Sequence, residues 1–451
     1  MLMQALRAAA LTLLLCCLCP AAAVPFAENG GLKMLYDNRM YPQAVELGDH
    51  LYMVWRGSEG FPYARSYDLE TRKFSEPVML LEGLEDTVNK KKYRNDHHFA
   101  PVIWKDLNDH LHVLFGMHNT KGMHLVSENA RDISAWRRGP EVAEIMSYPK
   151  IHQVYGNQTL IYFRYTGHLG FWTYRISGDN GETWRGPEAG LVDMNAEPQT
   201  GFMASHAGSY ETTRVSEDGK TLHVAFIWKV EDPLPSFRYS KVLHDHTRRH
   251  NLYYMKVDLP TGKAYNYEGK ELPVPISKEV ADRDCLVWDT QGRVAAVGPS
   301  IHLTEEGEPS FVLPVSDKTP LMSKFYYIRR NGKKWVRTPI AKTSHPFNSA
   351  HLDRDDQNNI QAYLVTGKGE SVSPKGMDYY GWGDKVEHFV SSDDGASWQL
   401  VADLTPKPGR KYQNIQFVAK GPREISKDIF LFYGWDTNDG VGTGYLWDGR
   451  K

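Results

Sequence analysis

Cysteine is scarce in this 451-residue chain: Cys16, Cys17 and Cys19 lie in the first 23 residues, and only Cys285 follows. An intrachain disulfide beyond residue 23 is therefore excluded, and stability must come from a large core. The 55 acidic and 53 basic residues nearly balance, so the charge does not indicate a nucleic-acid or anionic-membrane partner. Helical periodicity is nearly absent, and short alternating apolar runs recur instead.

The first 23 residues have the pattern of a signal peptide. Arg7 precedes an apolar run from Ala8 to Cys19, and Ala21 to Ala23 supply a small-residue cleavage site. That run is shorter than the roughly 20 residues needed to cross a bilayer, and no later segment is long and apolar enough. We therefore predict a secreted protein, extracellular or periplasmic, with a single domain over residues 24–451. No Pro/Ser-rich linker divides that span.

Two distant stretches share the pattern Ser-x-Asp-x-Gly-x-x-Trp, at residues 177–184 and 391–398. In such a turn the Asp accepts backbone N–H groups, the Gly adopts a positive φ and the Trp packs between sheets. This is the Asp-box, a hairpin signature of β-propellers. Two copies with all four positions kept indicate a repeat array.

A repeated apolar strand marks the modules of that array, often after a polar turn. Seven such markers predict an all-β, seven-bladed β-propeller, with six or eight blades as open alternatives. We expect residues 441–447 and an early N-terminal strand to close the ring. The markers are residues 50–55, 110–115, 159–163, 221–226, 309–313, 360–364 and 428–432.

Reactive side chains fall at corresponding strand ends of three consecutive modules. The start of the first strand and the end of the second lie on one face of a propeller, where a site forms around the axis. We therefore expect these side chains to converge, although any one of them alone would more often be a turn residue. They are His97, His98 and His118 in the second module, Tyr148 and Arg164 in the third, and His206 in the fourth.

This set of residues favours one kind of sugar chemistry. Glycoside hydrolysis normally needs two carboxylates beside the bond, and no such pair is evident here. β-Elimination from a uronic acid needs a cation on the carboxylate, a base for the C5 proton and an acid for the departing C4 oxygen. Arg suits the first role, and neutral His and Tyr suit the others.

The spacing of His98 and His118, followed by Tyr148 and by Arg164 sixteen residues later, resembles the BNR-repeat polysaccharide lyases of families 24 and 25. Those enzymes are seven-bladed propellers that degrade ulvan, a sulfated polymer of rhamnose and uronate. The resemblance covers the Asp-boxes and the second to fourth blades. It implies that His98 and Tyr148 act as base and acid, and that Arg164, with His118, neutralises the uronate. His97 competes for the role of His98.

Further substrate contacts are expected from His206, from Tyr165 and from Arg249. Arg249 ends a basic string over residues 238–249, which would form a sulfate-binding rim or else a solvated loop. The substrate would be an anionic polysaccharide, and we expect the protein to act as a monomer.

The resemblance also implies a metal away from the chemistry. Cys285 with His246, His250 and His302 would suit zinc, with His244 also nearby in sequence. The alternative is that Cys285 is a buried, inert thiol. The elimination itself requires no cofactor.

Two rival functions share the propeller signature. A sialidase would need an arginine triad and the Phe/Tyr-Arg-Ile-Pro signature, but the nearest string, Tyr162 to Tyr165, departs after the Arg. A non-catalytic lectin would repeat its site from blade to blade, whereas the candidate residues here differ between blades.

Overall fold

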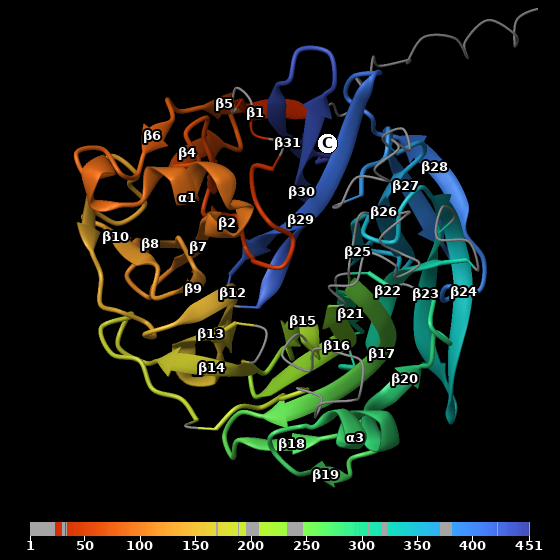
Figure 1. Cartoon of the computed structure of the whole chain (residues 1–451). Coiled ribbons are helices and arrows are strands. Elements are labelled where there is room, and N and C mark those ends of the chain that lie inside the picture. The colour runs from red at the N-terminus through yellow and green to blue at the C-terminus, as the bar shows by residue number, and fades with distance from the viewer. Residues whose placement is uncertain are drawn as a thin grey trace, which may run out of the picture.

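The computed structural model describes residues 23–28, 32, 34–167, 170–187, 189–194, 207–231, 247–293, 295–296, 298–304, 306–317, 323–369, 381–421 and 423–450. Within these residues the strands form six hydrogen-bonded sheets. The sheets follow one another around a common axis in chain order (Figure 1). The predicted all-β class is therefore confirmed.

The largest sheet joins the two ends of the chain. It contains β1 (Val24–Glu28), β31 (Gly442–Asp448), β30 (Glu424–Asp436), β29 (Arg410–Lys420), β2 (Ala44–Leu47), β3 (His50–Arg56), β4 (Pro62–Asp68) and β5 (Lys73–Phe74), with β6 (Val78–Met79) on β4. β1 pairs antiparallel with β31, as expected from the sequence. β2 meets β29 in a short parallel contact through Val45 and Glu46.

The other five sheets each use consecutive or nearly consecutive strands. One contains β7 (Val102–Lys105), β8 (Leu111–Phe115), β10 (Met123–Ser127) and β11 (Trp136–Arg138). The next contains β9 (His118–Thr120), β12 (Met146–Val154), β13 (Gln158–Tyr165) and β14 (Phe171–Ser177). The third contains β15 (Ala207–Val215), β16 (Thr221–Glu231), β17 (Thr247–Asp258), β18 (Lys263–Tyr265), β19 (Glu271–Leu272) and β20 (Leu286–Trp288). The last two contain β21 (Ser300–Leu303), β22 (Pro309–Ser316), β23 (Ser323–Asn331) and β24 (Lys334–Thr343), and β25 (Ala350–Arg354), β26 (Ile360–Thr366), β27 (Lys385–Ser391) and β28 (Gln399–Asp403).

Helical segments are short and lie between strands. They are the 3-10 turns η1 (Glu85–Thr87), η2 (His97–Phe99) and η3 (Tyr155–Asn157), the helices α1 (Lys90–Asn95) and α3 (Lys278–Val280), and the π-turn η5 (Ala281–Cys285). In the part of the chain that the structure describes, none is long and apolar enough to cross a membrane.

The seven apolar markers fall on β3, β8, β13, β16, β22, β26 and β30, and each of these strands lies between two antiparallel partners in its sheet. One expected boundary is wrong. His98 does not begin a strand, because His97–Phe99 form η2 and β7 begins only at Val102. Asp96 caps the turn by accepting the His98 N–H, and Pro101 has no N–H to donate to a sheet.

The two Ser-x-Asp-x-Gly-x-x-Trp turns have matching geometry. Asp179 accepts the Thr183 N–H at 2.9 Å, and Asp393 accepts the Ser397 N–H at 2.8 Å. Gly181 and Gly395 have φ of 84° and 80°, where a side chain would be strained. Trp398 packs against Tyr327 of the neighbouring sheet, 5.4 Å between rings. These turns therefore terminate β14 and β27 in the same way.

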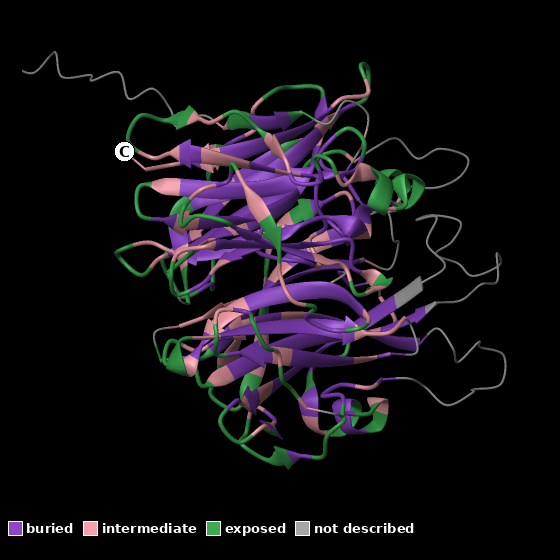
Figure 2. Cartoon of the chain, turned by 90° about the vertical axis from the view of Figure 1, so that its left-hand side faces the viewer, coloured by how far each residue is buried: buried purple, intermediate pink, exposed green. Residues whose placement is uncertain are grey.

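Buried residues run along the strands, and exposed residues gather in the connections (Figure 2). The main core cluster contains residues from five of the six sheets and from segments between strands, including Tyr36, Trp172 and Trp382, whereas residues of the β25 to β28 sheet belong to two smaller clusters. Because this core surrounds the axis, polar groups on the inner strand ends face one another rather than bulk solvent.

Candidate active site

The site begins with a loop that precedes β2 and lies across the inner strand ends. The Arg39 guanidinium donates to Asp37, with Nε 2.8 Å from Oδ1. His97 Nε2 lies 3.0 Å from Asp37 Oδ2. Burial alone would raise the pKa of Asp37, but the charge of Arg39 and the hydrogen bonds hold it well below its usual range. Asp37 is therefore an anion that fixes Arg39 and His97.

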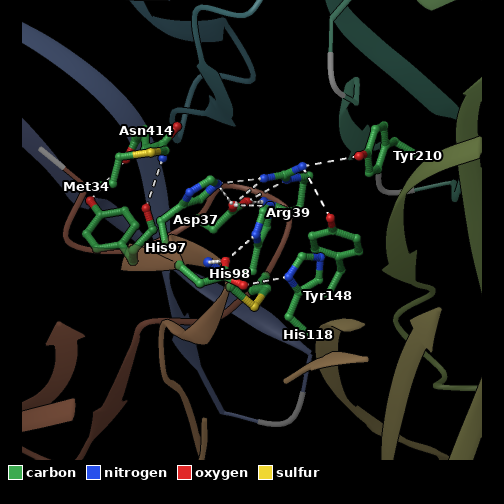
Figure 3. Close-up of polar contacts among 12 residues, drawn as sticks. Met34, Asp37, Arg39, His97, His98, His118, Tyr148, Tyr210 and Asn414 are labelled. Carbon is green, nitrogen blue, oxygen red and sulfur yellow. Dashed lines mark hydrogen bonds and ion pairs between the residues drawn. The ribbon is translucent and has the colours of Figure 1, made fainter. Parts of the chain in front are cut away.

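Asp96 holds two further histidines. His98 Nδ1 lies 2.5 Å from one carboxylate oxygen, and His118 Nδ1 lies 2.7 Å from the other (Figure 3). This arrangement places a proton on each Nδ1 and leaves each Nε2 as an acceptor. Burial, followed by the charges of His97 and Arg39, holds the pKa of His98 well below its usual range. His98 is thus a neutral imidazole at neutral pH, as a general base must be.

Tyr148 lies against these histidines at the start of β12. Its ring centroid is 5.4 Å from that of His98 and 6.0 Å from that of His118. The side chain is buried, and burial raises the pKa of its phenol well above the usual value. Tyr148 therefore keeps its proton and can donate it.

Arg164, on the second strand of the same sheet, lies over the Tyr148 ring with its Cζ 4.8 Å from the centroid. The residue is 3 % exposed. Its Nε and Nη2 atoms have no hydrogen-bond partner among the described residues. A buried guanidinium with open donors suits a planar anion such as a carboxylate.

Tyr210 on β15 completes the cluster and was not expected from the sequence. Its hydroxyl accepts a hydrogen bond from Arg39 Nη1 at 3.4 Å, and its ring is 5.6 Å from that of Tyr148. Burial alone would raise its pKa, but the charges of Lys229, Arg39, Arg249 and Arg164 lower the pKa of Tyr210 to about 7. Near neutral pH this phenol therefore exists partly as a phenolate.

The structure brings together His97, His98, His118, Tyr148 and Arg164, all named from the sequence. Tyr165 follows Arg164 on β13 and its ring stacks on Phe171 at 5.4 Å, so its expected contact with substrate stays a prediction. His206 lies outside the described residues. Sequence reasoning missed Asp37, Arg39, Asp96 and Tyr210. Asp96 directly precedes His97 and could have been found, whereas the loop of Asp37 and Arg39 has no motif.

Arg249 lies beside the site, but not in the exposed position that was expected from the sequence. It is 2 % exposed on β17, not on an exposed rim, and its guanidinium lies over Phe347 at 4.1 Å. It lines a small cavity with Asp37, Arg39 and Asn414. Arg249 therefore does not lie on an exposed rim, and its expected contact with substrate stays a prediction.

The structure tests the expected zinc ligands only in part. Among the described residues, no group able to hold a metal contains Cys285, His250 or His302, and His246 lies outside them. Cys285 is buried in η5 within the core, and burial raises the pKa of its thiol to about 12. His302 lies on β21 in a different sheet. The expected zinc site therefore stays a prediction, as does the alternative of an inert thiol at Cys285.

Two groups in the site do have metal-capable spacing: Asp37 with His97 and His98, and Asp96 with His98 and His118. In the first, Arg39 Nη2 lies 3.0 Å from His97 Nε2 and would repel a cation. In the second, both histidine Nδ1 atoms already face the carboxylate. The arrangement is thus suited to proton transfer and to binding an anion.

A ring of sheets with an asymmetric polar cluster on its inner strand ends defines a propeller-like protein. The family model described as BNR repeat-containing family member matches residues 81–343, more than half of the chain. The chain belongs to this BNR repeat-containing family.

Curated relatives include two ulvan lyases. One, named Ulvan Lyase-PL25, from Pseudoalteromonas sp. (strain PLSV), is 24% identical over 408 residues, covering 84% of this chain and 80% of the relative. Another, from Nonlabens ulvanivorans, is 25% identical over 379 residues, covering 75% and 74%. The resemblance expected from the sequence is thereby confirmed.

Solved structures show the same fold. A PL25 ulvan lyase bound to -[GlcA(1-4)Rha3S]- superposes with a TM-score of 0.76 at 20% identity, covering 95% of this chain and 96% of that one. The polysaccharide lyase Uly1 superposes with a TM-score of 0.59 at 12% identity, covering 96% and 98%.

Proposed function

We propose that this protein is a secreted polysaccharide lyase that cleaves a sulfated, uronate-containing polymer such as ulvan by β-elimination. The observation that carries the proposal is Arg164, a buried guanidinium with two open donor nitrogens beside Tyr148. A uronate carboxylate placed there would have its charge neutralised, and its C5 proton would become more acidic. The curated ulvan lyases support the same reaction class.

The proton transfers follow from the protonation states. Neutral His98 accepts the C5 proton through Nε2, while Asp96 stabilises the imidazolium that forms. Tyr148 donates its phenolic proton to the departing C4 oxygen. Tyr210, whose pKa is about 7, supplies a second base. Which base acts depends on whether the uronate is glucuronate or its C5 epimer, because the C5 hydrogen then lies on opposite faces of the ring.

Hydrolysis by two carboxylates is disfavoured even though Asp37 and Asp96 lie in the site. A hydrolase needs one of its carboxyl groups protonated to serve as general acid. Here, against the effect of burial, the neighbouring Arg39 and histidines lower the pKa of both carboxyls well below the usual range. Neither group therefore has a proton to donate at neutral pH.

The finer architecture belongs to the same proposal. The nine-stranded sheet is divided by the short parallel contact between β2 and β29. Counting its two parts separately gives seven blades with the five other sheets. We take residues 1–23 as the signal peptide and 24–451 as one catalytic domain that acts as a monomer.

The decisive experiment follows ultraviolet absorbance while the purified protein acts on ulvan, with pectin, alginate and chondroitin sulfate in parallel. Elimination creates a C4–C5 double bond conjugated to the carboxylate, so absorbance should rise with ulvan and stay flat with Arg164→Ala. New reducing ends without absorbance would show a hydrolase instead. Neither signal with any of the four polymers would indicate a protein that only binds sugar.

A further inference from the structure

Lys150 carries a buried ammonium directly beneath the site. It lies on β12, two residues after Tyr148, and is 0 % exposed. Its Nζ donates to the Tyr148 carbonyl at 3.1 Å and lies 4.4 Å from the centroid of the Trp172 ring. Burying an ammonium is costly unless it gains specific partners. The elimination steps assigned above do not use Lys150.

The backbone of Tyr148 explains what this ammonium does. Tyr148 has φ of 60°, a strained conformation for a residue other than glycine. The pairing of β12 with β13 shifts between Ser147 and Lys150, so Tyr148 has no partner in the ladder. Its carbonyl therefore depends on Lys150 for a donor. The strained backbone in turn sets the direction of the Tyr148 phenol.

Glu211 provides the matching negative charge on the neighbouring sheet. It directly follows Tyr210 on β15 and is 2 % exposed. Its carboxylate accepts hydrogen bonds from Ser209 Oγ at 2.7 Å and from the Tyr162 hydroxyl. Burial lowers the pKa of Lys150 to about 7 and raises that of Glu211 to about 7, and the charge of each group opposes the shift of the other.

We propose that Lys150 and Glu211 are positioning residues that hold the Tyr148 and Tyr210 phenols in register. β12 and β15 lie in different sheets, and no strand pairing joins them in the described residues. Tyr162, the ladder partner of Lys150 on β13, donates its hydroxyl to Glu211 across that gap, and the rings of the two phenols lie 5.6 Å apart. This inference rests on the proposed lyase function, in which both phenols take part.

The test compares Lys150→Met with the control His152→Gln. His152 also links β12 to β15, with Nε2 2.7 Å from Thr213 Oγ1. Among the described residues it makes no hydrogen bond or ring contact with Tyr148 or Tyr210. Lys150→Met should lower kcat roughly 10- to 100-fold with KM nearly unchanged, because small misplacement of reacting groups costs rate more than binding. The control should keep the wild-type kcat. A wild-type kcat in Lys150→Met would overturn the proposal.

Two further measurements cover the remaining outcomes. If Lys150→Met does not fold, Glu211→Gln keeps acceptor capacity for Ser209 and Tyr162 while removing the charge, and should lower kcat in the same direction. A wild-type kcat there would also refute the proposal. A crystal structure of the folded variant should show the Tyr148 ring displaced from Tyr210. An unmoved Tyr148 ring would contradict the positioning role. If the wild type proves inactive on every polymer, that result counts against the lyase function, and the crystal structure still tests the positioning role.

Discussion

The sheet of β12 to β14 and the sheet of β25 to β28 have corresponding strand positions but different side chains at the ends of their inner strands. In each, the Ser that opens the Asp turn pairs with the second strand: Ser177 with Thr159, and Ser391 with Ile360. Counting from those pairs, Arg164 corresponds to Val365. The inner strands correspond as well, since Ser147 pairs with Arg164 and the Ser349 carbonyl accepts the Val365 N–H.

Some of the corresponding residues have the same structural role in both sheets. Tyr162 and Tyr363 occupy matching positions, and each donates its hydroxyl to a carboxylate on another sheet, Glu211 and Asp428. The catalytic candidates are not shared, because Tyr148 is replaced by Ala350 and Arg164 by Val365. The difference teaches that the repeat builds the scaffold, while side chains particular to one sheet, here Tyr148 and Arg164, contribute to the site.

The strongest test of this comparison changes each of the two corresponding residues, Arg164 and Val365, to alanine. Arg164→Ala should lower kcat/KM by roughly 10³-fold, because a buried charge complement to the uronate is lost. Val365→Ala removes only core methyl groups and should cost about 1–3 kcal/mol of stability with kcat unchanged. Initial rates on ulvan and thermal unfolding of both variants measure this contrast. Equal losses of rate would refute it.

The phenol of Tyr148 provides the next largest effect. Tyr148→Phe keeps the ring that packs on His98 but removes the proton donor, so kcat should fall roughly 10²- to 10⁴-fold. The kcat of His98→Ala should fall by a factor in the same range, because the base is lost. Circular dichroism of both variants should match the wild type. Near-normal turnover in both would place the chemistry elsewhere.

A pH profile separates the two tyrosines. The pKa of Tyr210 is lowered to about 7, so its phenolate forms as pH rises through that value. If Tyr210 is the base, kcat/KM on the epimer that it serves should fall as pH drops below about 7 in the wild type. Tyr210→Phe should remove that limb and leave a lower, flatter profile. An unchanged limb in the variant would exclude Tyr210 as its source.

The smallest effect concerns the shared turns. Asp179→Ala and Asp393→Ala each remove the acceptor for a backbone N–H and a hydroxyl. Both should lower the melting temperature by a few degrees, with kcat unchanged. The pKa of Asp393 is lowered to about 2 by hydrogen bonds from Ser397. The Asp393 turn should therefore keep its bonds until pH approaches that value.

Local patterns were enough to predict much of this protein. Short apolar runs identified the second strands, because these strands are buried on both faces. The two Asp turns were readable because their hydrogen bonds span only four residues. His98, His118, Tyr148 and Arg164 were found because strand ends of a repeat array fall on one face.

Other features were decided only by the tertiary structure. Asp37 and Arg39 enter the site from a loop without a motif, and Tyr210 gains its low pKa from cations on several strands. The burial of Arg249 and Cys285 likewise depends on neighbours distant in the chain. The sequence by itself determined the repeating strands, their turns and the reactive strand ends, since these depend on near neighbours. Charges, protonation states and the burial of Lys150 and Glu211 arise from contacts across sheets, and only the ring of sheets creates those contacts.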